Sequence, residues 1–232
     1  MSGLLRTKIP KERPGPEGGK RDRNRRERSA ALINAGLDLF LEFGIEQTSI
    51  DDIAKNASMA KGNFYRYFDD KASLVELIIA PLAQELRLAF HRCEEKLRAA
   101  NTPEALAAAY SELSLTFGIL SAQRPKALRL YLQEKRAPQS PSRGAIHRLA
   151  SEIEESAMRL SRYAVEGGLV RVGDHRVGVL FVIGAAEQLT LSRLNGAIDA
   201  DDATVVRVVV QMMLEGIIRR DLDIESALGS AG

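Results

Sequence analysis

The chain has no tryptophan, and Cys93 is its only cysteine among 232 residues. A lone thiol cannot form an intramolecular disulfide, so we expect a reducing, cytoplasmic setting. His91, His147 and His175 are too far apart in the sequence to show the spacing of metal ligands. We therefore expect no metal and no cofactor.

Two features typical of enzymes are also missing from the sequence. It shows no clustered nucleophile, base and acid, and no glycine-rich phosphate loop. The pair Gly167-Gly168 instead suits the end of a helix. An enzyme is therefore the disfavoured alternative, since it would need a cleft built from residues that form no recognisable motif.

Long uninterrupted apolar runs are scarce. The most apolar stretch, VVRVVVQMMLEGIIRR, is interrupted at every fourth residue by Arg207, Gln211, Glu215 and Arg219. On a helix these four side chains form one narrow polar stripe, which favours a helix buried on most sides over a membrane span. The N-terminus has charge but no apolar segment of the kind found in signal peptides. We expect a soluble protein without a membrane partner.

Basic residues are concentrated at the N-terminus. Residues 1–28 contain ten Lys/Arg and four Asp/Glu, a net charge of +6, so the other 204 residues carry −4 of the total of +2. This distribution predicts contact with a polyanion at one end of the molecule. For residues 1–19 a solubilising tail is an equal alternative. The arginines close to the first predicted helix are candidate DNA contacts: Arg21, Arg23, Arg25 and Arg26.

Helical periodicity runs from about residue 25 onward, and no alternating run is long enough for a sheet, which predicts an all-α fold. Residues 1–24 are rich in proline, glycine and charge and are expected to be a disordered arm. Residues 25–71 are expected to form a three-helix head, and residues 72–232 a larger helical domain. The first predicted helix begins near residue 25. The later ones are predicted over residues 49–57, 61–68, 72–98, 103–121, 125–136, 145–166, 174–194 and 201–219.

The stretch KGNFYRYF, residues 61–68, holds four of the twelve aromatic residues of the chain. Phe64 and Phe68 are four residues apart, so they share one helix face and are expected to anchor the helix in the core. With the preceding short helix, the stretch predicts a helix-turn-helix over residues 49–68. A purely structural aromatic core is the alternative. The side chains expected to point outward are Lys61, Asn63, Tyr65, Arg66 and Tyr67.

From about Arg26 to Leu77 the chain resembles the TetR family of bacterial transcriptional regulators, through LFLEFG, TSIDDIAKNA and KGNFYRYFDDK. The resemblance implies a sequence-specific regulator that binds double-stranded DNA at a palindromic operator. It implies that Lys61, Gly62 and Asn63 face the major groove. It also implies DNA-backbone contacts from Ser49, Tyr65, Tyr67 and Lys71.

Two positions depart from the family pattern. Ser58 stands where the turn usually has glycine, and Ala60 stands where a capping Ser or Thr is usual. We expect Ser58 to adopt a left-handed conformation at modest cost. Losing the cap at Ala60 should weaken the recognition helix by about 1 kcal/mol.

The last two predicted helices carry a large apolar surface, and one chain has few other helices left to cover it. A second copy is the expected partner, and the family resemblance implies a four-helix interface between two chains. Such a homodimer would place two recognition helices roughly 34 Å apart, the spacing of successive major grooves. Two ordinary core helices are the alternative. The expected interface residues are Leu180, Phe181, Gly184, Gln188, Leu191, Val209 and Met213.

By the same resemblance, the middle helices would enclose a cavity for a small-molecule effector that releases a repressor from its operator. A DNA-bound organiser that recruits partners without an effector is the alternative. Glu187 lies in an apolar run and would meet a cationic ligand, an arginine such as Arg129, or water at the dimer edge. The candidate cavity residues are Leu113, Phe117, Tyr131, Met158, Tyr163, Glu187 and Gln188.

Overall fold

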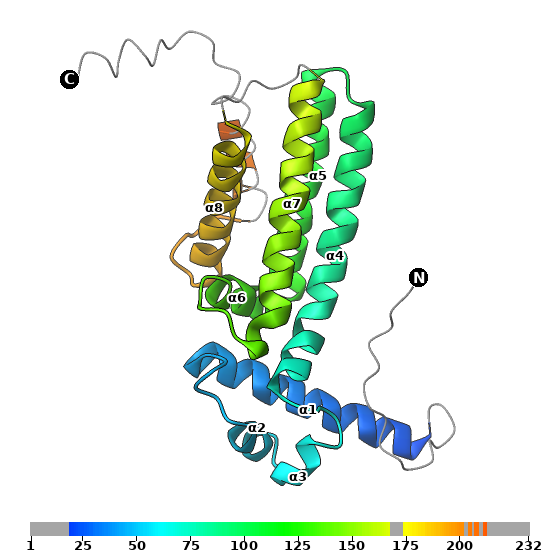
Figure 1. The fold of residues 1–232 in the computed structure, drawn as a ribbon, viewed down its shortest axis with the longest axis vertical. Helices are drawn as coiled ribbons and strands as arrows, with labels where there is room; N and C mark the ends of the chain where they lie inside the picture. Colours follow the sequence, from blue (N-terminus) through cyan, green and yellow to red (C-terminus); the bar gives the residue numbers. More distant parts are fainter. Residues whose placement is uncertain (1–18, 168–173, 202–203, 206, 209–210, 213–232) are drawn as a thin grey trace, which may run out of the picture. The chain divides into compact units, whose positions relative to one another are not determined.

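The structure is a computed structural model that describes residues 19–167, 174–201, 204–205, 207–208 and 211–212. All regular secondary structure in these ranges is helical, which confirms the predicted all-α fold (Figure 1). The elements are α1 (Lys20–Phe43), α2 (Ile50–Asn56), α3 (Lys61–Phe64), α4 (Lys71–Ala99), α5 (Pro103–Gln123), α6 (Pro125–Glu134), the 3-10 helix η1 (Pro141–Arg143), α7 (Gly144–Glu166) and α8 (His175–Leu194). The predicted last helix, 201–219, lies largely outside the described residues.

The described residues cluster into two compact units. Unit 1 takes residues 19–86 and 120–152, and unit 2 takes the described residues of 87–119 and from 153 onward. The chain passes between the units within α4, within α5 and within α7. The three N-terminal helices belong to unit 1, together with α6 and η1.

α1 begins earlier than the sequence predicted, at Lys20 rather than near residue 25. The expectation of a disordered arm is therefore wrong for residues 20–24, while residues 1–18 lie outside the described part of the chain. The segment KRDRNRRER contains no proline or glycine, and lysine, arginine and glutamate all favour helix. An ion pair of 3.0 Å between Arg26 and Asp22, one turn apart, adds to this preference.

Within the head, α1 packs through a face of small and large apolar side chains. Leu32 and Phe40 are almost fully buried. Gly36 lies against α4, where a Cβ atom added to it would stand 2.6 Å from Cδ2 of Leu74. Gly44 ends the helix with a φ of +83°.

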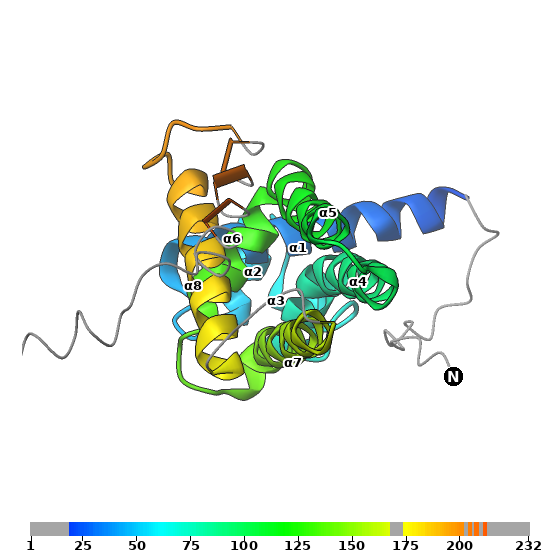
Figure 2. The ribbon, with the colours of Figure 1, turned by 90° about the horizontal axis from the view of Figure 1, so that it is seen from above.

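In unit 2, α5 and α7 lie on either side of the second half of α4 (Figures 1 and 2). Arg92 of α4 pairs with Glu112 of α5 at 3.4 Å. On the other side, the guanidinium of Arg98 lies 4.9 Å from the centre of the Tyr163 ring on α7. Cys93 is buried within this unit, and burial raises the pKa of its thiol to about 12. A thiol kept protonated in this way is unreactive.

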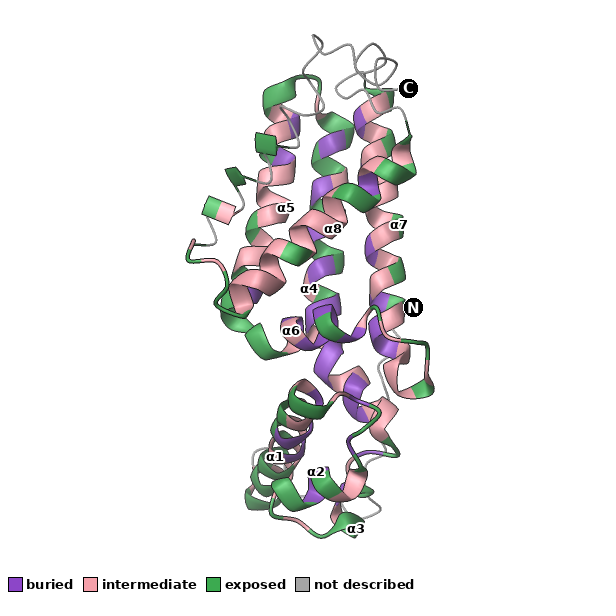
Figure 3. Cartoon of the chain, turned by 90° about the vertical axis from the view of Figure 1, so that its left-hand side faces the viewer, coloured by how far each residue is buried: buried purple, intermediate pink, exposed green. Residues whose placement is uncertain are grey.

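The burial pattern differs between α4 and α8. Buried residues recur along the length of α4, whereas α8 is mostly half-buried or exposed (Figure 3). Val179 is the only buried side chain among the residues of α8. Phe181, by contrast, is 70% exposed.

We expect Gly36→Val to lower the free energy of unfolding by about 1–3 kcal/mol, because the new side chain enters space already filled by the buried Leu74. Gly62→Val is the matched control in the same head, since a Cβ atom there meets nothing within 4 Å. Urea denaturation measures both. Equal stability of the two variants would contradict close packing at Gly36.

Candidate nucleic-acid interface

The first helix of the motif, α2, begins with a reciprocal cap. The backbone N–H of Asp52 donates to Oγ of Ser49 at 3.1 Å, and the backbone N–H of Ser49 donates to the Asp52 carboxylate at 3.2 Å. Hydrogen bonds from the side chain and backbone of Ser49 hold the pKa of Asp52 below its usual value. Ser49, expected to contact DNA backbone, thus fixes the start of α2 from an exposed position.

The turn between α2 and α3 has the strained residue that the sequence predicted. Ser58 adopts a φ of +56°, the only left-handed non-glycine residue in the described ranges. Its N–H donates to the carbonyl of Lys55 at 2.9 Å, and that of Met59 donates to the carbonyl of Ala54 at 2.8 Å. Ala60 precedes α3 without a side-chain cap, as expected.

Segment 61–68, which contains α3 and the turn after it, places its aromatic side chains in two environments. Phe64 is 0% exposed and Phe68 is 4% exposed, with ring centres 5.4 Å apart. Tyr65 is 52% exposed, although its ring meets Phe64 edge-on at 5.7 Å. The predicted anchors are therefore buried. Among the residues predicted to face DNA, Lys61, Gly62, Tyr65 and Arg66 are exposed, and Asn63 and Tyr67 are half-buried.

The regular part of α3 is shorter than predicted. The α-helix covers only Lys61–Phe64, and residues 65–67 form a turn. The N–H groups of Tyr67 and Phe68 both donate to the carbonyl of Phe64, at 2.9 and 3.0 Å. The segment has little intrinsic preference for a longer helix, because Ala60 provides no side-chain cap and Gly62 lies within the first turn.

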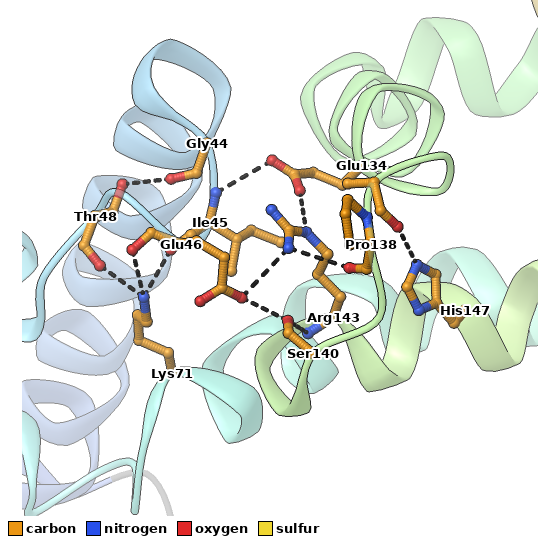
Figure 4. A network of polar contacts seen from close by, with 11 residues as sticks. Gly44, Ile45, Glu46, Thr48, Lys71, Glu134, Pro138, Ser140, Arg143 and His147 are labelled. Carbon is orange, nitrogen blue, oxygen red and sulfur yellow. Dashed lines mark hydrogen bonds and ion pairs between the residues drawn. The ribbon is translucent and has the colours of Figure 1, made fainter.

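Lys71, which the family resemblance places on a phosphate, is bonded within the chain in this structure. Its ammonium group donates to the backbone carbonyls of Ile45, Glu46 and Thr48, at 2.7, 3.2 and 2.9 Å (Figure 4). An ammonium group has three protons, and all three are used within the chain. In this structure Lys71 therefore holds the connection between α1 and α2 in place.

The opposite side of this connection is fixed by a carboxylate that the sequence analysis missed. Glu134, at the end of α6, accepts the N–H of Ile45 at 3.1 Å and the Nε–H of Arg143 at 2.5 Å (Figure 4). The side chains of Glu134 and Arg143 are only 10% and 12% exposed. Arg143 also pairs with Glu46 at 3.5 Å. Glu134 lies four residues after Leu130 and three after Tyr131. Helical periodicity therefore places it on the buried face of α6, and this spacing could have identified it from the sequence.

The four arginines predicted to contact DNA, Arg21, Arg23, Arg25 and Arg26, lie on the first turns of α1. Arg21 and Arg23 are exposed. Arg25 is half-buried and Arg26 is exposed and paired with Asp22. Arg25 and Arg26 are therefore carried by a helix and lie on different faces of it.

The predicted cavity residues are divided between the two units. Tyr131 is buried on α6 in unit 1, whereas the other six belong to unit 2. The hydroxyl of Tyr163 accepts a hydrogen bond from Arg98 at 2.7 Å and lies 3.3 Å from Glu94. Among the six predicted cavity residues of unit 2, five are half-buried and Gln188 is exposed; the five are Leu113 and Phe117 on α5, Met158 and Tyr163 on α7, and Glu187 on α8.

The predicted dimer residues of α8 leave apolar surface open in the single chain. Leu180 and Phe181 are exposed, and a Cβ atom added to Gly184 meets nothing within 4 Å. Leu191 is half-buried, and Gln188 donates to Ser192 at 3.2 Å. Val209 and Met213 lie outside the described residues, but Val208 and Met212 are exposed.

Residues 32–78 match the family model of the bacterial regulatory proteins of the tetR family. The chain is 35% identical over 79 residues to the HTH-type transcriptional repressor Rv3405c of Mycobacterium tuberculosis, a match that covers 34% of this chain. It spans only 42% of the length of that curated relative. The family-model match covers α2, α3 and the adjoining parts of α1 and α4.

Solved structures resemble the chain over most of its length. The regulator FadR from Bacillus subtilis, in complex with stearoyl-CoA, aligns with a TM-score of 0.58 and 20% identity over 81% of this chain and 98% of FadR. AibR, in complex with isovaleryl coenzyme A and operator DNA, aligns with a TM-score of 0.60 and 18% identity over 80% of this chain and 97% of AibR. At these identities the likeness shows a shared fold.

We expect Lys71→Met to lower the free energy of unfolding by about 1.5–3 kcal/mol, because three backbone carbonyls lose a charged donor. The salt dependence of DNA binding should stay unchanged. Lys55→Met is the matched control, since Lys55 is exposed and pairs only with the nearby Asp51 among the described residues. A weaker salt dependence with unaltered stability would instead make Lys71 a phosphate contact.

Proposed function

The chain belongs to the TetR family of bacterial transcriptional regulators, and we propose that it is a cytoplasmic, homodimeric repressor released from a palindromic operator by a small molecule. One observation carries the DNA-binding part of this proposal. Segment 61–68, which begins with α3, is anchored by the buried Phe64 and Phe68, and this leaves Lys61 and Tyr65 exposed on the same segment. Membership of this non-enzymatic family agrees with the expectation that the chain is not an enzyme.

On DNA, α3 would enter the major groove. Lys61 and Asn63 would reach base edges, while Gly62 lets the backbone approach closely. The hydroxyls of Tyr65 and Tyr67 would donate to phosphates. Such contacts fix the position of the protein on the duplex without carrying sequence information.

The exposed apolar surface of α8 supports a second copy as its partner. By length and composition alone α8 could cross a membrane, as could α5. In a DNA-binding family, however, an apolar helix face is more simply covered by an identical helix, and a two-fold dimer matches a palindrome.

A small-molecule effector is supported by the solved relatives. FadR and AibR, which share this fold, were each crystallised with an acyl coenzyme A. Acyl-CoA thioesters are therefore the first compounds to test. A ligand with higher affinity for one arrangement of the helices would shift the protein away from the DNA-binding arrangement.

The second candidate is a DNA-bound organiser without an effector. Two measurements on the purified full chain distinguish it from the proposed repressor. Under the repressor proposal, an acyl-CoA raises the melting temperature and dissociates a fluorescent operator complex. Under the organiser proposal, no compound does either, and a pull-down with immobilised chain and DNA recovers a protein partner instead.

We expect Asn63→Ala and Tyr65→Phe to have different effects on DNA binding. Asn63→Ala should relax discrimination at one base pair by about 1–3 kcal/mol. Tyr65→Phe should weaken binding to every duplex by about 1.5–3 kcal/mol, because a hydroxyl donor to phosphate is lost while the ring against Phe64 is kept. Affinities for a selected duplex and its single-base variants measure both. Wild-type affinity and base preference in both variants would remove α3 from the DNA contact.

We expect Phe181→Glu to convert the homodimer into a monomer and to reduce palindrome affinity to that for a half-site, because the charge would be desolvated in the interface. Leu115→Glu is the matched control, an apolar residue of α5 that is 50% exposed. Sedimentation equilibrium gives the mass of each variant. A dimeric Phe181→Glu variant would place the interface elsewhere.

A further inference from the structure

α1 carries one stripe that changes its chemistry along the helix. Leu32, Ala35 and Leu39 follow one another at intervals of three and four residues and lie on one face. Within the head, Leu32 is 0% and Ala35 is 4% exposed. Toward the N-terminus the same face continues, at steps of four, three and four residues from Leu32, with Arg28, Arg25 and Arg21.

This change occurs where α1 leaves the rest of the head. The first turns of α1 extend beyond α2 and α3 in both views of the ribbon (Figures 1 and 2). Arg21 and Arg28 are exposed, and Arg25 is half-buried. No ion pair joins these three arginines to another described residue. The helix face that buries Leu32 against the rest of the head thus carries three arginines where α1 extends beyond α2 and α3.

The other basic side chains of these turns lie on different faces. Arg26 pairs with Asp22 at 3.0 Å, and Lys20 and Arg23 are exposed. Charges that served only solubility would have no reason to continue the packing stripe. Arginine presents rigid pairs of donors that match phosphate oxygens.

We propose that Arg21, Arg25 and Arg28, here called the arginine row, bind DNA phosphates beside the site read by α3; the inference rests on the proposed function. The row follows the face that α1 turns toward the interior of its head, so a duplex lying against α3 and passing under the first turns of α1 would meet it. At a rise of 1.5 Å per residue the row spans roughly 10 Å, about three phosphate steps of one strand.

The test compares two variants of equal charge loss in the full-length protein. The row variant is Arg21→Gln, Arg25→Gln and Arg28→Gln; the control variant is Lys20→Gln, Arg23→Gln and Arg26→Gln. The probe is a duplex that the wild-type protein selects from a random-sequence pool, with a scrambled duplex beside it. Circular dichroism confirms that both variants keep their helix content.

In the row variant, the slope of log Kd against log[salt] should fall by about 0.9 for each lost phosphate contact, about 2.7 for each bound chain. The control variant should lose less than about 1. Preference for the selected over the scrambled duplex should persist in both, because phosphate contacts carry no sequence information.

Hydroxyl-radical footprints should shorten at the flanks only in the row variant. Equal slopes in the two variants would overturn the row, since the charges would then act only diffusely. A wild-type slope in the row variant would overturn it as well, while DNA binding by α3 would stand. A wild-type chain that binds no duplex would remove the proposed function and the row together.

Discussion

The burial of two phenyl rings, those of Phe64 and Phe68, determines where segment 61–68 lies. A helix as short as Lys61–Phe64 is unstable by itself, because nucleation costs more than one turn of hydrogen bonds returns. Each fully buried phenylalanine contributes about 1.5–3 kcal/mol, so Phe64 and Phe68 supply stability that the uncapped segment lacks. The exposure of Lys61 and Tyr65 follows from that anchoring, and the proposed contact with a duplex depends on this exposure.

The connection between α1 and α2 depends on charged groups from distant parts of the sequence. Lys71 of α4 satisfies three of its carbonyls, and Glu134 of α6 satisfies the N–H of Ile45 (Figure 4). Arg143 compensates the buried charge of Glu134, which would otherwise be costly. A displacement of α6 relative to α1 must carry these bonds along or break them. Within unit 1, the three N-terminal helices are therefore joined to α6 through specific hydrogen bonds.

Local signals in the sequence predicted most of the described helices and the buried pair of segment 61–68, but not the start of α1 or the short length of α3. The Ser49 cap, the left-handed Ser58, the stop at Gly44 and the inward pair Phe64 and Phe68 depend on residues within a few positions of one another, so periodicity and capping rules predict them. The role of Lys71 could not be predicted in this way, because its partners lie more than twenty residues away. The start of α1 was missed because composition favoured disorder, whereas the helix preference of its charged residues favoured continuation.

Hydrogen–deuterium exchange of the full chain, with and without its selected duplex, tests most directly whether α3 is the DNA-reading element. The account predicts slower exchange on DNA at the amides of residues 61–67 and across the start of α2, with little change along the second half of α4. Unchanged exchange at residues 61–67, with protection on another surface of a demonstrably DNA-bound chain, would contradict it.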